Sequence, residues 1–291
     1  MTGREPLDLY TDAASTSAGV VIARYSTSFG AAARLLGSGV RSQVRDLYAL
    51  VRVADEIVDG AAAAAGLSVD EQRERLDEFE RETDRAVLTG FSTNLVVHAF
   101  ATTARATGIG TDLTAPFFAS MRRDLDPRPF EADEVERYIH GSAEVIGLMC
   151  LRAFVAGQVY SSDELRLLED GACHLGAAFQ KVNFLRDLSA DWSSLGRNYF
   201  PAVDPARMTE EEKTAILDDI DDDLAIAGRA ITRLPRNSRA AVTAAHALFG
   251  RLSVKLRATP ASDLLSCRVR VPDAEKLTIA VRAAVTAGRE P

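Results

Sequence analysis

The chain has 291 residues, of which 47% are hydrophobic and 7% aromatic, and its formal net charge is −8. That length suits one large domain or two small ones, and the negative charge argues against a nucleic-acid partner. The three cysteines, Cys150, Cys173 and Cys267, are too widely spaced for a disulfide framework or a zinc pattern. No segment approaches the ~18 consecutive apolar residues that span a bilayer, and the N-terminus lacks the apolar run of a signal peptide. We therefore expect a cytoplasmic protein.

Alanine is abundant and aromatic residues are few, which favours helices over sheets. Residues 1–16 are predicted to be a loosely ordered lead-in, followed by a helix over 17–36 that ends at a glycine-rich break. We then expect a helix over 41–59 and a connection through the alanine run 60–66. Further helices are predicted over residues 71–88, 92–107, 112–124, 133–155, 163–191, 210–234, 238–257 and 273–287. No repeat or linker divides the chain, so the expected fold is an all-α single domain.

The helix over 41–59 carries a stripe of polar side chains. Asp55 and Asp59 are four residues apart, so their carboxylates share one helix face, which Arg52 and Tyr48 extend. Like charges at this spacing repel, and inside an apolar segment the pair indicates a bound cation. A solvated helix face is the alternative interpretation of the pair taken alone.

A second stripe lies on the helix predicted over 163–191. Gln180, Asn183, Asp187 and Asp191 recur at three- and four-residue steps on a helix that is otherwise apolar. Amide and carboxylate groups on such a helix favour a lined cavity over a solvated face. The two stripes can face each other across the interior of a bundle.

Hard oxygen ligands of this kind suit Mg²⁺, which takes one or two carboxylates together with substrate phosphates. The chemistry inferred from the residues is the binding and ionisation of a diphosphate, whose developing negative charge the cations neutralise. Arg52 and Arg186 stand beside the two acidic clusters and can donate to phosphate oxygens.

The chain resembles the squalene/phytoene synthase family of head-to-head prenyl synthases, and among them the bacterial phytoene synthases. The resemblance rests on five ordered blocks: Tyr25–Phe29, Asp46–Asp59, Tyr138–Met149, Gln180–Pro201 and Arg268–Val271. It implies an isoprenoid-synthase-type helical bundle around a central active-site cavity, with residues 17–291 as the catalytic domain.

The resemblance also implies a function. This is the condensation of two geranylgeranyl diphosphates to 15-cis-phytoene through prephytoene diphosphate, with release of diphosphate, as in carotenoid biosynthesis. The alternatives are squalene or dehydrosqualene synthesis from farnesyl diphosphate, and a non-catalytic relative that acts as an assembly factor. We expect no nicotinamide cofactor. Because prenyl substrates partition into membranes, peripheral attachment at the inner face of the membrane is an alternative to a purely cytoplasmic location; the oligomeric state stays open.

The family's site residues map onto this chain as follows. Magnesium, or Mn²⁺ in its place, is expected at Asp55, Asp59, Asn183, Asp187 and Asp191. The catalytic set is Tyr48, Arg52, Asp55, Asp59 and Asp187. Substrate binding is expected from Tyr25, Ser26, Ser28, Gln180, Asn183, Arg197 and Arg268.

Three positions depart from the family pattern, and one acidic run invites another interpretation. Ala190 stands where an acidic residue is usual, and Phe249 aligns with a usual tyrosine. Glu144 replaces a glycine and is expected either to line the cavity or to pair with an arginine. The acidic run 218–223 points all round its helix, so we interpret it as a solvated face.

Overall fold

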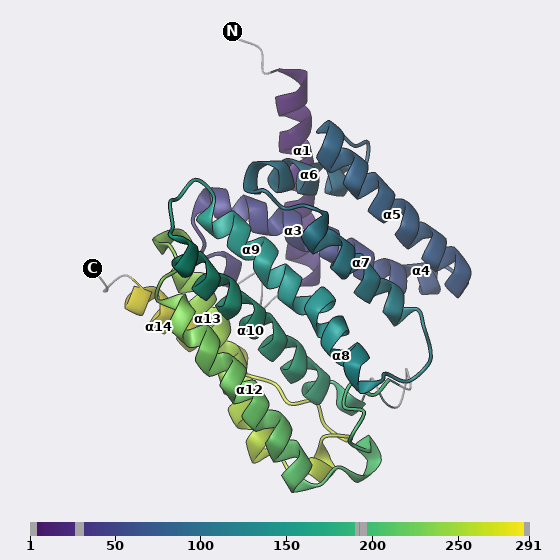
Figure 1. The fold of residues 1–291 in the computed structure, drawn as a ribbon, viewed down its shortest axis with the longest axis vertical. Helices are drawn as coiled ribbons and strands as arrows, with labels where there is room; N and C mark the ends of the chain where they lie inside the picture. Colours follow the sequence, from purple (N-terminus) through teal and green to yellow (C-terminus); the bar gives the residue numbers. More distant parts are fainter. Residues whose placement is uncertain (1–4, 27–31, 190–191, 193–196, 288–291) are drawn as a thin grey trace.

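The computed structural model describes residues 5–26, 32–189, 192 and 197–287. Every regular element within these ranges is helical, which confirms the predicted all-α fold (Figure 1). The α-helices are α1 (Pro6–Tyr25), α3 (Ser38–Val58), α4 (Ala61–Ala64), α5 (Val69–Thr89), α6 (Leu95–Thr107), α7 (Thr111–Asp124), α8 (Ala132–Ile139), α9 (Val145–Val155), α10 (Ser162–Arg186), α12 (Glu210–Ile231), α13 (Arg236–Ala258) and α14 (Asp273–Ala287).

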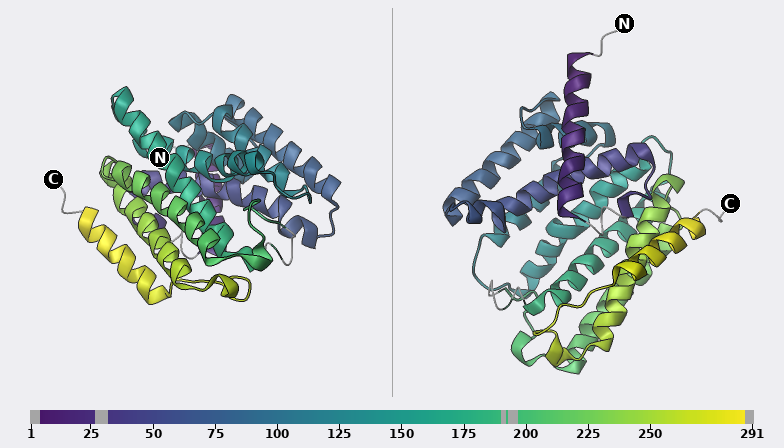
Figure 2. Two further views of the ribbon diagram at one scale, coloured as in Figure 1. Left: turned by 60° about the horizontal axis from the view of Figure 1, so that its bottom comes forward. Right: turned by 180° about the vertical axis from the view of Figure 1, so that it is seen from behind.

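Helix α10 lies at the centre of the bundle, in contact with α9 on one side and with α12 and α13 on the other (Figure 1). Helix α3 packs against α1, α5, α6, α7 and α9, and α14 lies along the outside of α13 (Figure 2). One apolar core, which includes Phe100, Phe117 and Phe118, joins α3, α5, α6, α7 and α9. A second core joins α10, α12 and α13. Helices α3 and α10, which carry the predicted acidic stripes, are therefore each packed between other helices.

The first helix differs from the prediction at both ends. It begins at Pro6, so the prediction of a loosely ordered lead-in is wrong for residues 6–16. Proline at the first helical position is pre-organised for the helix, and Asp8 in the first turn complements the helix dipole. The helix ends at Tyr25, because Ser26 takes an extended conformation with φ −134° and ψ 115°.

The helix predicted over 133–155 is present but contains a π-helical turn, His140–Glu144, between α8 and α9. At Gly141 a Cβ atom would lie 2.2 Å from the carbonyl oxygen of Pro116, so only glycine permits this contact with α7. By length and composition alone, Ala132–Val155 could span a membrane, but half of its most apolar stretch is buried inside the bundle, as in the core helix of a folded domain.

Helix α10 starts at the predicted place and ends early. Ser161 and Glu164 form a capping box at its N-terminus. The helix ends at Arg186, and Asp187 is its C-cap residue with φ −99° and ψ 8°, so the predicted continuation to residue 191 is wrong at this point. The alanine run over 60–66, predicted as a connection, contains the single helical turn α4.

The small residues of α9 and α10 allow close packing of neighbouring helices. A Cβ atom at Gly147 would lie 2.5 Å from the carbonyl oxygen of Ala172, and one at Gly171 would lie 2.2 Å from Cβ of Ala230. Real Cβ atoms do not approach so closely, so α9, α10 and α12 are held at distances that only glycine allows.

Gly171→Ala should destabilise the fold by about 1–3 kcal/mol, because the new methyl group forces α10 and α12 apart. The control is Gly250→Ala on α13, where a Cβ atom would meet nothing within 4 Å. That change should stabilise the helix by up to about 1 kcal/mol. Urea unfolding of both variants tests the contrast, and equal effects would contradict the packing described.

Asp46 joins three helices through a buried carboxylate. It lies on α3, and the hydroxyls of Ser15 on α1 and Thr103 on α6 donate to its two oxygens at 3.0 and 2.8 Å. Burial raises the pKa of Asp46 from 3.8 to about 6, although both hydrogen bonds act to lower it. The ionised carboxylate therefore weakens the fold at neutral pH.

We predict that Asp46→Asn gains about 2 kcal/mol of stability relative to the unmodified chain as the pH rises from about 4.5 to about 7.5. The pKa of Asp46 is about 6 in the folded chain and 3.8 in the unfolded chain. The contribution of protonated Asp46 to the free energy of unfolding is therefore fully present below pH 3.8 and is lost as the pH rises through 6. Urea unfolding at the two pH values measures the difference. A difference that does not change with pH would show that Asp46 is not the group responsible.

Candidate active site

The first acidic cluster lies at the C-terminal end of α3. The guanidinium of Arg52 donates to Asp55 at 2.8 Å and also pairs with Glu56. Burial raises the pKa of Asp55 to about 6 against the opposing effect of Arg52, and Asp59 raises it further. Asp55 and Asp59 thus interact electrostatically, as their predicted shared face requires. The positive charge of Arg52 does not fully compensate for the burial of Asp55 and its repulsion from Asp59.

Asp59 is the C-cap residue of α3, and its carboxylate pairs with an arginine that is 138 residues away in sequence. The two terminal nitrogens of Arg197 donate to its oxygens at 2.9 and 3.2 Å. Burial opposes the charge of Arg197, but Asp59 and Asp124 more than offset that effect and raise the pKa of Arg197. The structure therefore brings together two residues that the sequence implied separately.

Asp124, which the sequence analysis missed, lies beneath this pair. Its backbone carbonyl accepts a hydrogen bond from Arg197 at 2.6 Å, and its carboxylate accepts one from the Tyr138 hydroxyl at 2.7 Å. Burial raises the pKa of Asp124 to about 7, and the charge of Asp59 adds to the shift. A signal existed in the sequence, because Asp124 follows Phe117 and Ser120 by seven and four residues and so shares the buried face of α7.

The second acidic cluster lies at the C-terminal end of α10. Asp187 accepts hydrogen bonds from Arg186 at 2.6 and 3.1 Å, and pairs with Arg268 at 2.6 Å. Burial acts to raise the pKa of Asp187, but the two arginines more than offset it, so the pKa is lowered. Asp187 is thus ionised and held by two cationic groups, one of them from the distant C-terminal segment.

Asp59 and Asp187 occupy equivalent places, each as the C-cap of a helix. The backbone N–H of Asp59 donates to the backbone carbonyl of Asp55, and that of Asp187 donates to the backbone carbonyl of Asn183, each at 2.8 Å. A carboxylate at a helix C-terminus is disfavoured by the helix dipole, whereas a cation is favoured there. Both positions therefore attract positive charge, and in this structure arginines supply it.

Tyr25, Ser26 and Tyr48 surround Arg52 at the end of α1. The guanidinium of Arg52 lies 4.4 Å from the centroid of the Tyr25 ring, and Ser26 forms a side-chain hydrogen bond with Tyr48. Burial raises the pKa of Tyr48, so its hydroxyl is neutral at physiological pH. These three predicted site residues are brought to the first acidic cluster.

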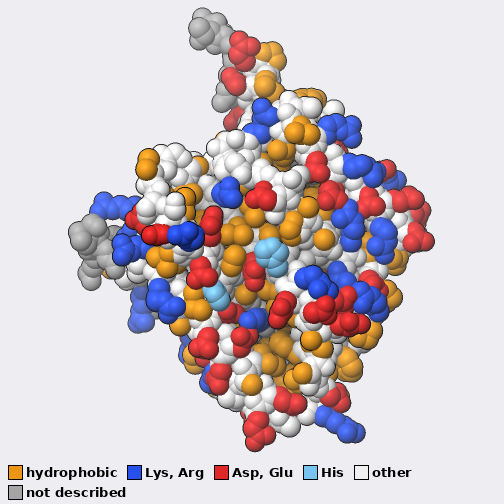
Figure 3. Space-filling model, viewed as in Figure 1, with side chains coloured by type: hydrophobic (Ala, Val, Ile, Leu, Met, Phe, Trp, Pro, Cys, Tyr) orange, Lys and Arg blue, Asp and Glu red, His pale blue; other side chains and the backbone are white. Residues whose placement is uncertain are grey.

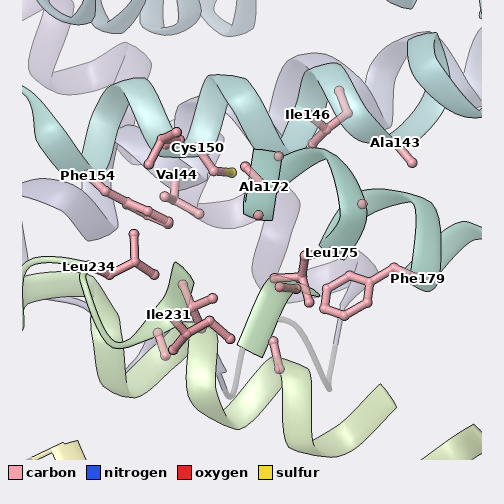
Figure 4. A pocket seen from close by; sticks show the side chains of 18 of the residues that line it. Val44, Ala143, Ile146, Cys150, Phe154, Ala172, Leu175, Phe179, Ile231 and Leu234 are labelled. Atoms are coloured by element: carbon pink, nitrogen blue, oxygen red, sulfur yellow. The ribbon is translucent and has the colours of Figure 1, made fainter. Parts of the chain in front are cut away.

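An apolar cavity of about 300 Å³ lies between α3, α9, α10, α12 and α13 (Figure 4). Phe154 and Leu234 lie at one end of it, and Phe179 and Ala143 at the other. Val51 and Gln180 also line the cavity. The cavity is mostly walled by aliphatic and small side chains, as a site for a hydrocarbon chain requires.

The cavity lining includes residues from both helices that carry the acidic clusters. Val51 precedes Arg52 on α3, and Gln180 lies one turn before Asn183 on α10. The side chain of Asn183 has no hydrogen-bond partner within the described ranges, which leaves its amide available to a ligand. Of the second predicted stripe, Gln180 lines the cavity, whereas Asn183 and Asp187 do not. The predicted lining by amide and carboxylate groups therefore stays a prediction.

Two predicted site residues, Ser28 and Asp191, lie outside the described residues, as does Ala190. Phe249 stacks on Phe179 with ring centroids 3.7 Å apart, so the residue at this position contributes apolar area beside the cavity. The carboxylate of Glu144 lies 2.9 Å from Nδ1 of His140, within hydrogen-bond distance. The expectation that Glu144 pairs with an arginine finds no support in the described contacts.

The acidic run 218–223 is only partly solvated. Asp218 and Asp221 pair with Arg257, as expected of a helix surface. Asp223, however, is buried and bonded to His174 at 2.6 Å and to Lys181 at 2.8 Å, so the prediction of a solvated face is wrong there. The periodicity of α12 turns Asp223 toward α10.

The broader surface shows no comparable concentration of charge on the face seen in Figure 3. Lys and Arg side chains are interspersed there with Asp and Glu, so neither sign dominates that face. A ligand attracted to the clusters would be selected by local groups more than by a long-range field.

The donor chemistry fits Mg²⁺, although the described residues contain no ready-made group of three His, Cys, Asp or Glu side chains around one point. Magnesium keeps several waters and is held by one or two carboxylates plus phosphate oxygens, so a complete protein cage is not required. Burial, and after it the charge of Asp59, raises the pKa of Asp55, and a cation bound beside the pair would act to lower it.

Residues 22–275 match the squalene/phytoene synthase family. The chain is 30% identical to the 15-cis-phytoene synthase of Paracoccus sp. (strain N81106 / MBIC 01143) over 182 residues, 62% of this chain and 57% of the relative. It is also 30% identical to the 15-cis-phytoene synthase of Pantoea ananas over 183 residues, 61% of this chain and 56% of that protein. The matched region spans less than two thirds of these relatives.

Solved structures of similar fold cover nearly the whole chain. A dehydrosqualene synthase in complex with a ligand superposes with a TM-score of 0.79 at 18% identity, covering 98% of this chain and 100% of its own. Squalene synthase HpnC from Alicyclobacillus acidocaldarius has a TM-score of 0.68 at 15% identity, covering 86% and 95% of the two chains. These likenesses establish the fold, and the family match establishes that the chain belongs to the squalene/phytoene synthase family.

Proposed function

We propose that this protein is a phytoene synthase that condenses two molecules of geranylgeranyl diphosphate head to head. The observation that carries the proposal is an apolar cavity whose lining includes Val51 and Gln180, residues of the two helices that each end at an arginine-paired aspartate. The cavity suits a prenyl chain, and the clusters suit the diphosphate at its end. The cavity alone would indicate only an apolar ligand, and the clusters alone would indicate only a phosphate or a cation.

The proposed reaction has two stages. First, the C1–O bond of one substrate breaks and its electrons leave with the diphosphate. The double bond of the second substrate supplies the electrons of the new carbon–carbon bond, and loss of a proton closes a cyclopropane ring. In the second stage the remaining C–O bond breaks, the carbon skeleton rearranges, and loss of another proton gives the triene. No oxidant or reductant is consumed.

The arginines have the donors that this chemistry needs. Arg52, Arg197 and Arg268 each have terminal guanidinium nitrogens beside a cluster, and such groups bind phosphate oxygens in pairs. A fixed array of donors stabilises the diphosphate as its negative charge increases during bond breaking. Gln180 lines the cavity, and Tyr48 lies beside Arg52 with a hydrogen bond to Ser26. Both are proposed to orient the reacting end of the prenyl chain.

Asp55, Asp59, Asn183, Asp187 and Asp191 are the residues proposed to hold Mg²⁺, or Mn²⁺ in its place. When bound, the cations supply Lewis-acid stabilisation of the departing diphosphate. The protein's own contribution at these positions is to place carboxylates at two helix C-termini, where positive charge is favoured.

The cavity contributes by excluding water from a carbocation. Its walls are mostly apolar and include Val51, Ile146, Leu175 and Phe179, while Ser142, Cys150 and Gln180 also line it. A water molecule that reached the cation would give an alcohol in place of the coupled product. The mostly apolar wall therefore keeps water away from the carbocation intermediate.

The names of relatives favour the longer substrate. The two bacterial proteins at 30% identity are named 15-cis-phytoene synthase, whereas the dehydrosqualene synthase of similar fold is 18% identical. Synthesis from farnesyl diphosphate uses the same site chemistry and is the second candidate.

Product analysis tests the proposal. Purified protein with Mg²⁺ is given farnesyl or geranylgeranyl diphosphate separately, each with and without NADPH. We expect a forty-carbon triene from the longer substrate without NADPH. A thirty-carbon product would assign the protein to squalene-type synthesis, and no product from either substrate would favour the non-catalytic alternative.

Asp59→Asn should lower kcat/KM by on the order of 100-fold or more, because it removes a carboxylate proposed to bind the cation and the partner of Arg197. The fold should change by less than about 1 kcal/mol, since the lost ion pair is partly exposed. The control is Asp222→Asn, which alters an exposed carboxylate on α12 and should leave turnover unchanged. Full activity in the Asp59 variant would rule out its proposed role.

A further inference from the structure

Asp124 is a buried carboxylate at the edge of the candidate active site. It ends α7 with 7% of its surface exposed, among side chains that are mainly apolar. Burying a carboxylate costs free energy unless partners compensate for the lost water. Its partners are the hydroxyl of Tyr138 and the guanidinium of Arg197, and the second of these belongs to the candidate active site.

Arg197 has an inner and an outer partner. The outer partner is Asp59, whose side chain is 37% exposed and faces the candidate site. The inner partner is Asp124, whose side chain is 3% exposed, with its backbone oxygen 2.6 Å and its carboxylate 3.8 Å from the guanidinium. A ligand can therefore reach Asp59 and the outer side of Arg197 without reaching Asp124.

We propose that Asp124 is a positioning residue that keeps Arg197 in place while Arg197 exchanges Asp59 for the diphosphate of the substrate. This inference rests on the proposed function. In the exchange, Asp59 releases Arg197, and the freed nitrogens of Arg197 donate to phosphate oxygens. The contacts of Arg197 with the carbonyl and the carboxylate of Asp124 persist throughout, and the carboxylate supplies the charge that holds the guanidinium.

The surroundings of Asp124 are rigid enough for this role. The ring of Tyr138 stacks on Tyr199 with centroids 5.5 Å apart, and Tyr199 stacks on Phe184 with centroids 3.9 Å apart. Tyr199 is only two residues after Arg197, so the same aromatic cluster holds the backbone that carries the arginine. Asp124 then fixes the other end, the guanidinium itself.

A double-mutant cycle of Asp124→Asn and Arg197→Gln tests the proposal. The readouts are the affinity for inorganic diphosphate with Mg²⁺, measured by calorimetry at about pH 8, and kcat and KM measured separately with the prenyl substrate. Each single change should weaken diphosphate binding by about 10- to 100-fold, with the loss of kcat/KM appearing mainly in KM. The double variant should bind no more than about twofold more weakly than Arg197→Gln alone, because Asp124 acts through Arg197.

The matched control is Asp126→Asn, since Asp126 lies two residues further on and pairs with Arg128 outside the site. It should leave diphosphate binding unchanged. If Asp124→Asn does not fold, as judged by circular dichroism, Tyr138→Phe replaces it in the cycle, because that change removes the hydrogen bond to the carboxylate. A weaker but equally non-additive effect is then expected.

Three results would overturn the proposal. They are unchanged diphosphate affinity in Asp124→Asn, losses in the double variant that multiply, and no diphosphate binding by the unmodified chain. Diphosphate binding that shows the expected cycle, with no product from either prenyl substrate, would leave the positioning role standing and refute the proposed function instead.

Discussion

The structure depends on how negative charge is tolerated at the C-termini of α3 and α10. Each helix ends at an aspartate, where the helix dipole and the loss of water both disfavour a carboxylate. Arg197 and Arg268 come from later parts of the chain to neutralise Asp59 and Asp187. A fold selected only for stability would have apolar or basic residues at these two ends. The cost is consistent with a site that must accept cations and phosphate.

The helices around these ends are arranged so that the acidic clusters meet an apolar space. Glycines at 147 and 171 bring α9, α10 and α12 together, and the π-helical turn fits against α7 at Gly141. The remaining gap is the cavity, whose lining includes Val51 on α3 and Gln180 on α10. The bundle thus combines close helix packing at Gly147 and Gly171 with an apolar cavity between the same helices. A charged head group and a hydrocarbon chain can be accommodated by the same few helices.

Sequence patterns predicted the helices and part of the site, and they failed where distant segments meet. The spacing of Asp55 and Asp59 gave their shared face, because helix geometry is local. The pairing of Asp59 with Arg197 spans 138 residues and has no local signature; the family resemblance implied the two residues separately, and only the structure shows them paired. Asp124 went unnoticed because its partners come from Tyr138 and from the segment around Arg197. Helix ends were also misjudged: α10 ends at Arg186, and its C-cap residue Asp187 pairs with Arg186 and Arg268, which helix periodicity alone does not reveal.

The most direct test of the central claim is a crystal structure with Mg²⁺ and an unreactive analogue of geranylgeranyl diphosphate. We expect cations beside Asp55, Asp59 and Asp187, the analogue's diphosphate on Arg197 and Arg268, and its prenyl chain in the cavity that ends at Phe154 and Leu234. The hydrogen bond from Arg197 to the Asp124 carbonyl should persist. An analogue bound elsewhere, with the pairs Arg197–Asp59 and Arg268–Asp187 intact, would contradict this account of the site.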